Sequence, residues 1–510
     1  MPDEAKAANA GGVVGKADVG VRHYLDTAGG NTGIKNAPNT ATISGAYNTG
    51  AVQGFTGVGG IAGQMYQGSI ADSYNYGAMS STRTATANTT LRDPLNLGGI
   101  VGDATDISGG VGTVIYDVYN SGQIGDETFT YYGRHVGGIA GRLSGDIEKA
   151  YNTGDIYNGY SVVGGIAGWW HGGSIKNVFN TGNITVLNRD TGNQYSEVGG
   201  IVGASGASAS GLSYAYNLGT LRSIKGKELL NSNNGYSAVG GIIGRVRTPN
   251  LTISNVYTTN NIYAGVEDGK GDIIKDNGDD LAIGAIYATI DAGDPSHGSV
   301  QSITDAYLVE LYENEAFDFS KFNTNGVKNT TILPEKAKQQ NSYSGFFNTQ
   351  NTGWRIYDGK TLPILNAFTP DAAKHEDNWL TEDVKNQIKE NGVQYGTAAN
   401  PLLTIINAKE GAELRINGQD LGLHGAGSLA VYGNSGLTLT DFGVTLGSHY
   451  NGTVYSDGAL TITTGDAEGA LYNLGSGSRL YGSSVTFDAG GRDAGLYGKI
   501  TATNPRKAKA

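Results

Sequence analysis

The chain has 510 residues, of which 82 are glycine and 10 are proline, and its formal net charge at pH 7 is −12. That charge disfavours phosphate backbones, and no apolar run approaches the roughly 18–20 residues that span a bilayer, so we expect neither nucleic-acid binding nor membrane insertion. The absence of cysteine excludes disulfides, thiol nucleophiles and cysteine-ligated zinc.

Residues 11–310 contain an internal repeat with two parts. The first part is a glycine block of the form Gly-Gly-Ile-x-Gly, and its six clean copies are spaced by 39, 39, 27, 35 and 41 residues. The clean copies begin at Gly59, Gly98, Gly137, Gly164, Gly199 and Gly240, and variant copies lie at 11–15 and 282–286. The second part is a tyrosine block, mostly x-Tyr-Asn-x-Gly, which follows each glycine block. Its copies are 46–50, 73–77, 118–122, 150–154, 178–182 and 215–219, with decaying copies at 256–260 and 306–310.

The shortest repeat unit, residues 137–163, predicts the fold. It contains three short apolar stretches at 138–140, 147–151 and 155–157, each bounded by glycine or a turn residue and none with a helical period. Three short strands that repeat at similar length are typical of one coil of a parallel β-helix. We therefore predict an all-β, right-handed parallel β-helix over residues 1–310. Its glycines would serve corners that need a positive φ or a close backbone approach.

Stacked coils would align equivalent residues into columns about 4.8 Å apart. We predict an interior aliphatic column of Ile61, Ile100, Ile139, Ile166, Ile201 and Ile242. We predict an aromatic column of Tyr47, Tyr74, Tyr119, Tyr151, Phe179 and Tyr216. The asparagines that follow would form a hydrogen-bonded ladder of Asn48, Asn75, Asn120, Asn152, Asn180 and Asn217.

The period is lost over residues 311–401, which we interpret as a short helical or irregular junction. Thr381 as cap and Gly392 as stop predict a helix within 371–396. Period-two alternation returns over residues 402–503, which favours a second β-helical part over a β-sandwich. We expect the basic tail at 504–510 to be disordered.

The paired glycine and tyrosine blocks resemble the GLUG-motif repeats of bacterial surface proteins, and Trp354–Leu365 resembles the element that follows such repeats in filamentous-haemagglutinin-like adhesins of two-partner secretion. The resemblance implies a secreted, elongated, extracellular protein that attaches to a host or bacterial surface glycan or protein. It also implies passage through an outer-membrane transporter. Members of that family carry an N-terminal signal and a secretion domain. Because neither is seen here, the resemblance implies an interior part of a longer protein.

Trp169 and Trp170 are the candidate ligand-contact residues. If they lie on a strand, adjacent side chains point to opposite faces, so at most one of them faces outward. An outward tryptophan could stack on a sugar ring or anchor a protein partner. The simpler alternative, which we favour, is that one lies in the core and the other covers a corner.

Other candidate sites are weaker, and we assign no catalytic, cofactor-binding or metal-binding residue. A glycosidase would need two carboxylates about 5–10 Å apart, for which Asp103 and Asp106 could be considered. The densest acidic cluster consists of Asp268, Asp272, Asp276, Asp279 and Asp280. It lacks a complete calcium-loop pattern and is better interpreted as a solvated insertion. His375-Glu376 approaches a metallopeptidase motif, but Trp379 replaces the second histidine.

The sequence therefore favours a non-enzymatic adhesive segment whose columns build a rod and whose variable loops carry any specificity. A carbohydrate-active β-helix enzyme and a passive spacer stalk remain as alternatives.

Overall fold

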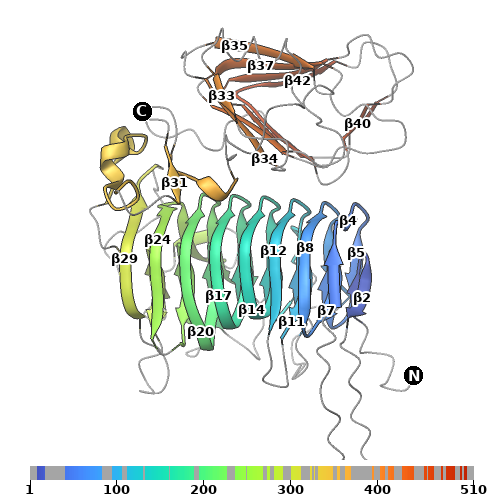
Figure 1. Cartoon of the computed structure of the whole chain (residues 1–510), viewed down its shortest axis with the longest axis vertical. Helices are drawn as coiled ribbons and strands as arrows, with labels where there is room; N and C mark the ends of the chain where they lie inside the picture. Colours follow the sequence, from blue (N-terminus) through green and yellow to red (C-terminus); the bar gives the residue numbers. More distant parts are fainter. Residues whose placement is uncertain are drawn as a thin grey trace, which may run out of the picture.

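The structure is a computed structural model (Figure 1). It describes residues 9–17, 41–82, 95–105, 112–129, 133–159, 161–188, 195–226, 236–248, 250–267, 273–275, 281–290, 300–311, 322–323, 327, 331–348, 353–356, 362–368, 393–395, 402–407, 412–417, 428–432, 434–440, 453–456, 458–463, 472–474, 478–488, 494–496 and 499–501. The predicted acidic cluster, Asp106, His375, residues 371–392 and the tail at 504–510 lie outside these residues.

The first part is a parallel β-helix whose coils contribute strands to three sheets (Figure 1). Sheet A runs in the order β1 (Ala10–Gly11), β6 (Gly57–Gly59), β10 (Asn96–Gly98), β13 (His135–Gly137), β16 (Ser161–Gly164), β19 (Tyr195–Gly199), β22 (Tyr236–Gly240), β27 (Leu281–Gly284) and β30 (Phe322–Asn323). All of its pairings are parallel, and all but the last, to β30, join one glycine block to the next.

Sheet B has a first arm after each glycine block and a second arm that ends in the tyrosine block. The first arm contains β2 (Val14–Ala17), β7 (Ala62–Met65), β11 (Val101–Ala104), β23 (Ile243–Val246) and β28 (Tyr287–Ile290). The second arm contains β3 (Ala41–Ser44), β4 (Tyr47–Asn48), β8 (Gly68–Asn75), β12 (Thr113–Asn120), β24 (Leu251–Thr259) and β29 (Val300–Val309). Three long strands span both arms, namely β14 (Ala140–Asn152), β17 (Ala167–Asn180) and β20 (Val202–Asn217).

Short strands close each coil on the third side. They are β5 (Val52–Gly54), β9 (Met79–Ser81), β15 (Ile156–Asn158), β18 (Ile184–Asn188), β21 (Leu221–Lys225) and β25 (Ile262–Glu267), with β26 (Ile273–Lys275) added antiparallel. Single bridges at Ile124 connect β9 to β15. We call this third layer sheet C.

The interior aliphatic column is confirmed. All six predicted isoleucines are fully buried in one apolar cluster, which lies between the arms of sheet B. Each isoleucine carbonyl accepts two N–H groups from the preceding coil, as at Ile100, which accepts from Ile61 at 2.9 Å and from Ala62 at 3.0 Å. A second, separate cluster, which includes Val136, Val163 and Ile184, fills the space between sheets A and C.

The asparagine ladder is also confirmed, and it saturates its amides. Nδ2 of each asparagine donates to Oδ1 of the next at 2.7–2.8 Å, from Asn48 through to Asn217. The same Nδ2 also donates to the carbonyl two residues on, for example from Asn152 to Gly154 at 2.8 Å. A buried amide that makes these bonds avoids the desolvation penalty of an unpaired polar group.

The glycines of the glycine and tyrosine blocks do not have positive φ angles, and other residues do. Seven non-glycine residues with φ between 47° and 58° occupy equivalent positions two residues before the aromatic column. They are Asp72, Asp117, Lys149, Asn177, Tyr214, Asn255 and Asp305. The left-handed residue breaks the strand alternation, so Ile115 and Val118 both face the interior and Tyr119 faces outward. The glycine blocks serve close backbone approach instead.

The aromatic column stacks along the outer side of this bend. Tyr119 and Tyr151 have ring centroids 4.9 Å apart and nearly parallel planes, and the stacking continues through Phe179. Further on, Tyr216 and Tyr257 stack at 5.0 Å. At the other end of the rod, Tyr47 is 68% exposed.

The junction packs against the aromatic column and closes its C-terminal end. This clamp segment, residues 331–348, 353–356 and 362–368, contains the 3-10 helices η3 (Pro334–Lys336), η4 (Gln340–Tyr343) and η5 (Asn366–Phe368) and the antiparallel pair β31 (Trp354–Arg355) and β32 (Ile364–Leu365). Trp354 lies 5.6 Å from the Tyr257 ring, whose hydroxyl donates to the Pro363 carbonyl at 2.8 Å. Pairing of the first solenoid also continues past residue 310, through β30 and a bridge from Val309 to Ile332.

The second part is also β-helical. One sheet contains β33 (Val393–Tyr395), β34 (Leu402–Asn407), β36 (Ser428–Tyr432), β38 (Thr453–Ser456), β41 (Arg479–Tyr481) and β44 (Lys499–Thr501). Another contains β35 (Ala412–Asn417), β37 (Asn434–Thr440), β39 (Ala459–Thr463) and β42 (Val485–Asp488), and β40 (Tyr472–Leu474) pairs with β43 (Ala494–Leu496). Apart from β33, the pairings are parallel, which excludes the β-sandwich. Val393–Tyr395, directly after the predicted helix stop at Gly392, form a strand that pairs with β34. The predicted helix itself lies outside the described residues.

Candidate functional site

Sheet A and the first arm of sheet B face each other because the chain reverses within every glycine block. The last glycine of the block permits this approach, since a Cβ atom on Gly141 would lie 2.7 Å from the backbone nitrogen of Leu97.

Side chains from the two strands meet beside each glycine block. On sheet A they come from the residue two positions before the block, and on sheet B from the residue directly after it. We call this line of side chains the polar seam. Its sheet A column is Asn96, His135, Val162, Glu197 and Ala238, and its sheet B column is Gln64, Asp103, Arg142, Trp169, Ala204 and Arg245.

At one end of the seam, Asp103 is held by a closed set of hydrogen bonds. Its Oδ2 accepts from Asn96 at 2.8 Å, and its Oδ1 accepts from the backbone and hydroxyl of Thr105 at 3.1 and 2.5 Å. The Asn96 amide is thereby oriented with its oxygen toward Nδ1 of His135, at 2.8 Å. His135 therefore donates from Nδ1. Asp103, considered above as part of a carboxylate pair, has a structural role here.

His135 is held neutral. Burial lowers its pKa well below the usual value of 6.5, and the nearby Arg134, Arg142 and Arg247 lower it further. A neutral imidazole suits a buried position beside cations, because protonation there would bury a further positive charge.

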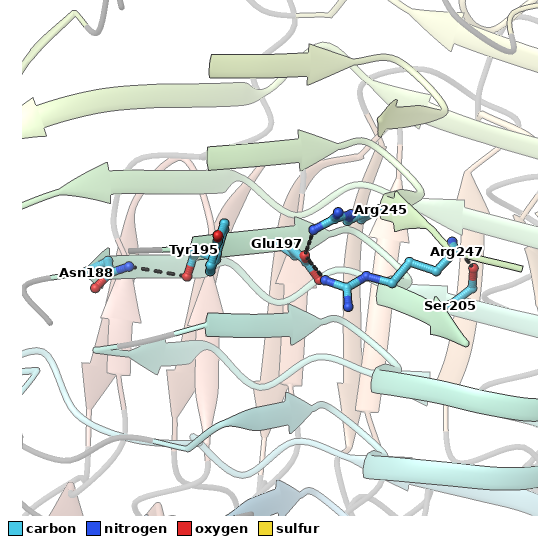
Figure 2. A network of polar contacts seen from close by, with 6 residues as sticks. All are labelled: Asn188, Tyr195, Glu197, Ser205, Arg245 and Arg247. Atoms are coloured by element: carbon cyan, nitrogen blue, oxygen red, sulfur yellow. Dashed lines mark hydrogen bonds and ion pairs between the residues drawn. The ribbon is translucent and has the colours of Figure 1, made fainter. Parts of the chain in front are cut away.

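The centre of the seam is a buried carboxylate bound by two arginines, shown in Figure 2. Glu197 is 1% exposed, and its Oε1 accepts from Arg245 at 2.8 Å and from Arg247 at 2.5 Å. The backbone nitrogen of Arg247 in turn donates to Ser205 at 3.1 Å. Removing one partner of such a pair leaves an uncompensated buried charge, which costs more than the intact pair contributes.

The two candidate tryptophans point to opposite faces, as adjacent strand residues must. Trp170 is fully buried in the aliphatic cluster, where its indole nitrogen donates to the Gly172 carbonyl at 3.1 Å. Trp169 faces the seam and is partly exposed, with its ring 5.0 Å from the Arg247 guanidinium and 5.5 Å from the His135 ring. The ligand-contact hypothesis is therefore carried forward for Trp169 alone.

Small residues on the intervening coil bring these side chains together. Ala204 pairs with Trp169 on one side and with Arg245 on the other. Gly206, two residues further along, would place a Cβ atom 3.3 Å from the indole nitrogen of Trp169. Because neither residue has a long side chain, Arg247 reaches across their coil to Trp169.

The result is a basic patch, which we define as Arg142, Trp169, His171 and Arg247. Burial and Arg142 lower the pKa of His171, which is otherwise exposed, so that side chain is largely neutral at pH 7. Within the described residues no carboxylate pairs with Arg142, and Glu197 is shared by Arg245 and Arg247. The patch is thus a local cationic surface on a chain of net charge −12.

Sequence reasoning found Trp169 but missed the arginines and Glu197. The available signal was the residue directly after each clean glycine block, which is Gln64, Asp103, Arg142, Trp169, Ala204 or Arg245 in successive copies. That position varies in charge and size while its neighbours repeat. Its partner on sheet A could not be recognised without knowing that the block folds the two strands face to face.

Among the described residues, no group of three or more histidine, aspartate or glutamate side chains is placed to hold a metal ion, and none of the helices is long and apolar enough to cross a membrane. No protein-family model, curated protein or solved structure matches the chain.

Proposed function

We propose that the chain is an adhesive segment of a large secreted bacterial surface protein, and that it attaches to surface glycan or protein through loops on a β-helical rod. This proposal rests on the resemblance of its paired blocks to GLUG-motif repeats and on the geometry of its insertions. Its location outside the cell, its export through an outer-membrane transporter and its lack of enzymatic activity belong to the same proposal.

The observation that carries the proposal is that chain length varies at fixed places on the coil. These are the link between the two arms of sheet B, as at residues 18–40, 105–112 and 291–299, and the link from sheet C to sheet A. The link from a sheet C strand to the next sheet A strand is residues 159–160 in the shortest coil. The same link is residues 82–95, 189–194 and 226–235 in other coils. In repeat proteins, insertions that leave from one side of a constant frame commonly form the binding face.

Attachment of the purified full-length chain to cells tests this proposal. Beads coated with the chain should bind target cells more than bare beads do. Replacing residues 83–94, 189–194 and 227–235 each by Gly-Tyr, the pair at 159–160, should lower attachment stepwise while the β-sheet circular dichroism is retained. Attachment equal to that of bare beads would instead indicate a spacer. Complete loss from one point substitution in a loop would contradict binding spread over many weak contacts.

A further inference from the structure

The basic patch has unsatisfied polar groups. Within the described residues, no acceptor reaches Nε of Arg142 or Nε of Arg247, and no donor reaches Oε2 of Glu197. Buried polar groups in native proteins are nearly always paired, so each exception calls for an explanation. Both Nε atoms are buried, so a ligand would meet the terminal nitrogens of these two guanidinium groups.

The patch is also open to solvent. The Arg247 side chain is 31% exposed, Arg142 and Trp169 are partly exposed, and His171 is exposed. Arg142 and Trp169 are register neighbours on adjacent strands, and Arg247 lies over the same Trp169 ring. The three side chains therefore form one surface whose two cations flank or cover an aromatic ring.

We propose that the basic patch binds the carboxylate of a sugar acid, such as a uronic acid unit of a surface polysaccharide. This inference rests on the proposed function, because it names the class of ligand that the adhesive rod would recognise. A guanidinium presents a planar fork of N–H donors that matches the two oxygens of a carboxylate. The rest of the chain is acidic, so an anionic polymer would be attracted at this patch and repelled elsewhere.

Position on the rod favours a polymer over a small free acid. The patch lies along the polar seam, parallel to the direction in which coils stack, with ligand-accessible groups from the strands β14, β17 and β23 and their flanks. Coils repeat about every 4.8 Å, so the backbone positions of Arg142 and Arg247 are three coils apart, about 14 Å. The Arg247 guanidinium itself reaches back to 5.0 Å from the Trp169 ring, beside Arg142. One acidic sugar held at these groups would lie on the line of the seam, along which neighbouring units of a polymer can continue.

Isothermal titration of the full-length protein with oligogalacturonate tests the proposal. The fully methyl-esterified oligomer is the matched ligand, because it keeps the sugar backbone and replaces each carboxylate by a neutral methyl ester. We expect binding of the acid and none of the ester. Arg142→Gln should weaken binding about tenfold or more, which corresponds to loss of one charge-assisted hydrogen bond. Arg222→Gln is the matched control, because Arg222 lies on sheet C over the Tyr263 ring and its loss changes the net charge equally.

Several results would overturn the proposal. Equal binding of the ester, or an equal loss from Arg142→Gln and Arg222→Gln, would show that the patch does not recognise the carboxylate. If dextran sulfate bound as tightly as oligogalacturonate, the binding would be a general attraction of polyanions and not recognition of a carboxylate. Arg247→Gln is a second variant, but it also removes a partner of buried Glu197, so its melting temperature must be measured beside its affinity.

Cell attachment separates this proposal from the proposed function. If the unaltered chain attaches to cells and loses attachment on loop shortening but does not bind oligogalacturonate, the carboxylate site is refuted and the adhesive segment stands. If the unaltered chain binds oligogalacturonate but attaches no better than bare beads, the carboxylate site stands and the adhesive function is refuted.

Discussion

A Cβ atom on Gly165 would lie 2.5 Å from Cγ of Asn180 on the following tyrosine block. The same relationship recurs between the second glycine of other blocks and the ladder asparagine of their own coil, as for Gly99 with Asn120 and Gly200 with Asn217. The two repeated motifs are therefore two sides of one contact. The glycine is small because the asparagine amide fills the space that a side chain would need.

Gly165→Ala should strongly destabilise the rod. Its methyl group would overlap the Gly200 carbonyl oxygen as well as the Asn180 amide, and the backbone has no room to move. We expect a loss of about 3 kcal/mol or more in the free energy of unfolding. Urea denaturation followed by circular dichroism measures it. Gly50→Ala is the control, because among the described residues its Cβ atom would lie within 4 Å of Oδ1 of Asn48 alone, at 3.7 Å, and an equal loss there would contradict the account.

Asn152→Ala should also be costly, because it breaks the ladder in the middle. Asn120 would lose the acceptor of its Nδ2, and Asn180 would lose the donor to its Oδ1. Asn120 keeps the bond from Nδ2 to the Gly122 carbonyl, but its other N–H and Oδ1 of Asn180 lose their ladder partners, and a buried group left unpaired costs about 1–3 kcal/mol. Asn48→Ala at the end of the ladder removes one ladder bond, to Asn75, and the local bonds between Asn48 and Gly50. Thermal melting should therefore show a smaller effect there. Equal effects would indicate that the amides do not act as a ladder.

Trp354→Ala should release the clamp segment from the aromatic column. Trp354 is 4% exposed and stacks on Phe346 at 4.4 Å while contacting the rings of Tyr216 and Tyr257. Truncating a buried tryptophan costs about 3–5 kcal/mol. We expect faster proteolysis within residues 331–368 and a changed near-ultraviolet circular dichroism signal, with the β-sheet signal intact. An unchanged cleavage rate would show that the clamp is held by other contacts.

The His135 imidazole should make stability depend on pH. Its pKa is lowered in the folded protein, so the unfolded chain binds more protons once the pH falls below about 6.5. The contribution of this histidine is therefore complete above pH 6.5 and declines as the pH falls toward the folded-state pKa. His135→Gln should flatten that part of the stability curve. The comparison is of urea midpoints for both proteins between pH 7.5 and 5, and parallel curves would refute the buried neutral state.

The columns of the first solenoid could be predicted because they repeat. Six copies of an isoleucine or an asparagine at one position of the block place those residues on neighbouring coils, and stacking does the rest. The left-handed position could not be found in this way, since Asp117, Lys149 and Tyr214 share a backbone angle but no side-chain chemistry. The seam was missed for a similar reason, because Glu197 and Arg245 become neighbours only through the reversal at the glycine block.

The clamp segment was predicted only as a junction. Trp354–Leu365 stood out by its resemblance to an element that follows such repeats, but nothing in the sequence indicates that Trp354 covers the rings of Tyr216 and Tyr257 far earlier in the chain. The aromatic column itself was predicted, whereas its outward direction depends on the left-handed residue two positions before it. The repeat pattern was therefore enough to predict the coil. The packing of the clamp segment on the aromatic column depends on contacts between distant residues and could not be predicted.

Cysteine cross-linking tests the stacking of coils most directly, because the natural sequence has no cysteine to interfere. Tyr116 and Glu148 are register partners on β12 and β14, and both side chains lie on the surface. Tyr116→Cys with Glu148→Cys should form a disulfide on mild oxidation, since partners on adjacent strands lie within the roughly 4.4–6.8 Å Cα separation that a disulfide requires. Tyr116→Cys with Lys176→Cys, one strand further along, should not. Cross-linking of the second pair but not the first would contradict the parallel β-helix in this register.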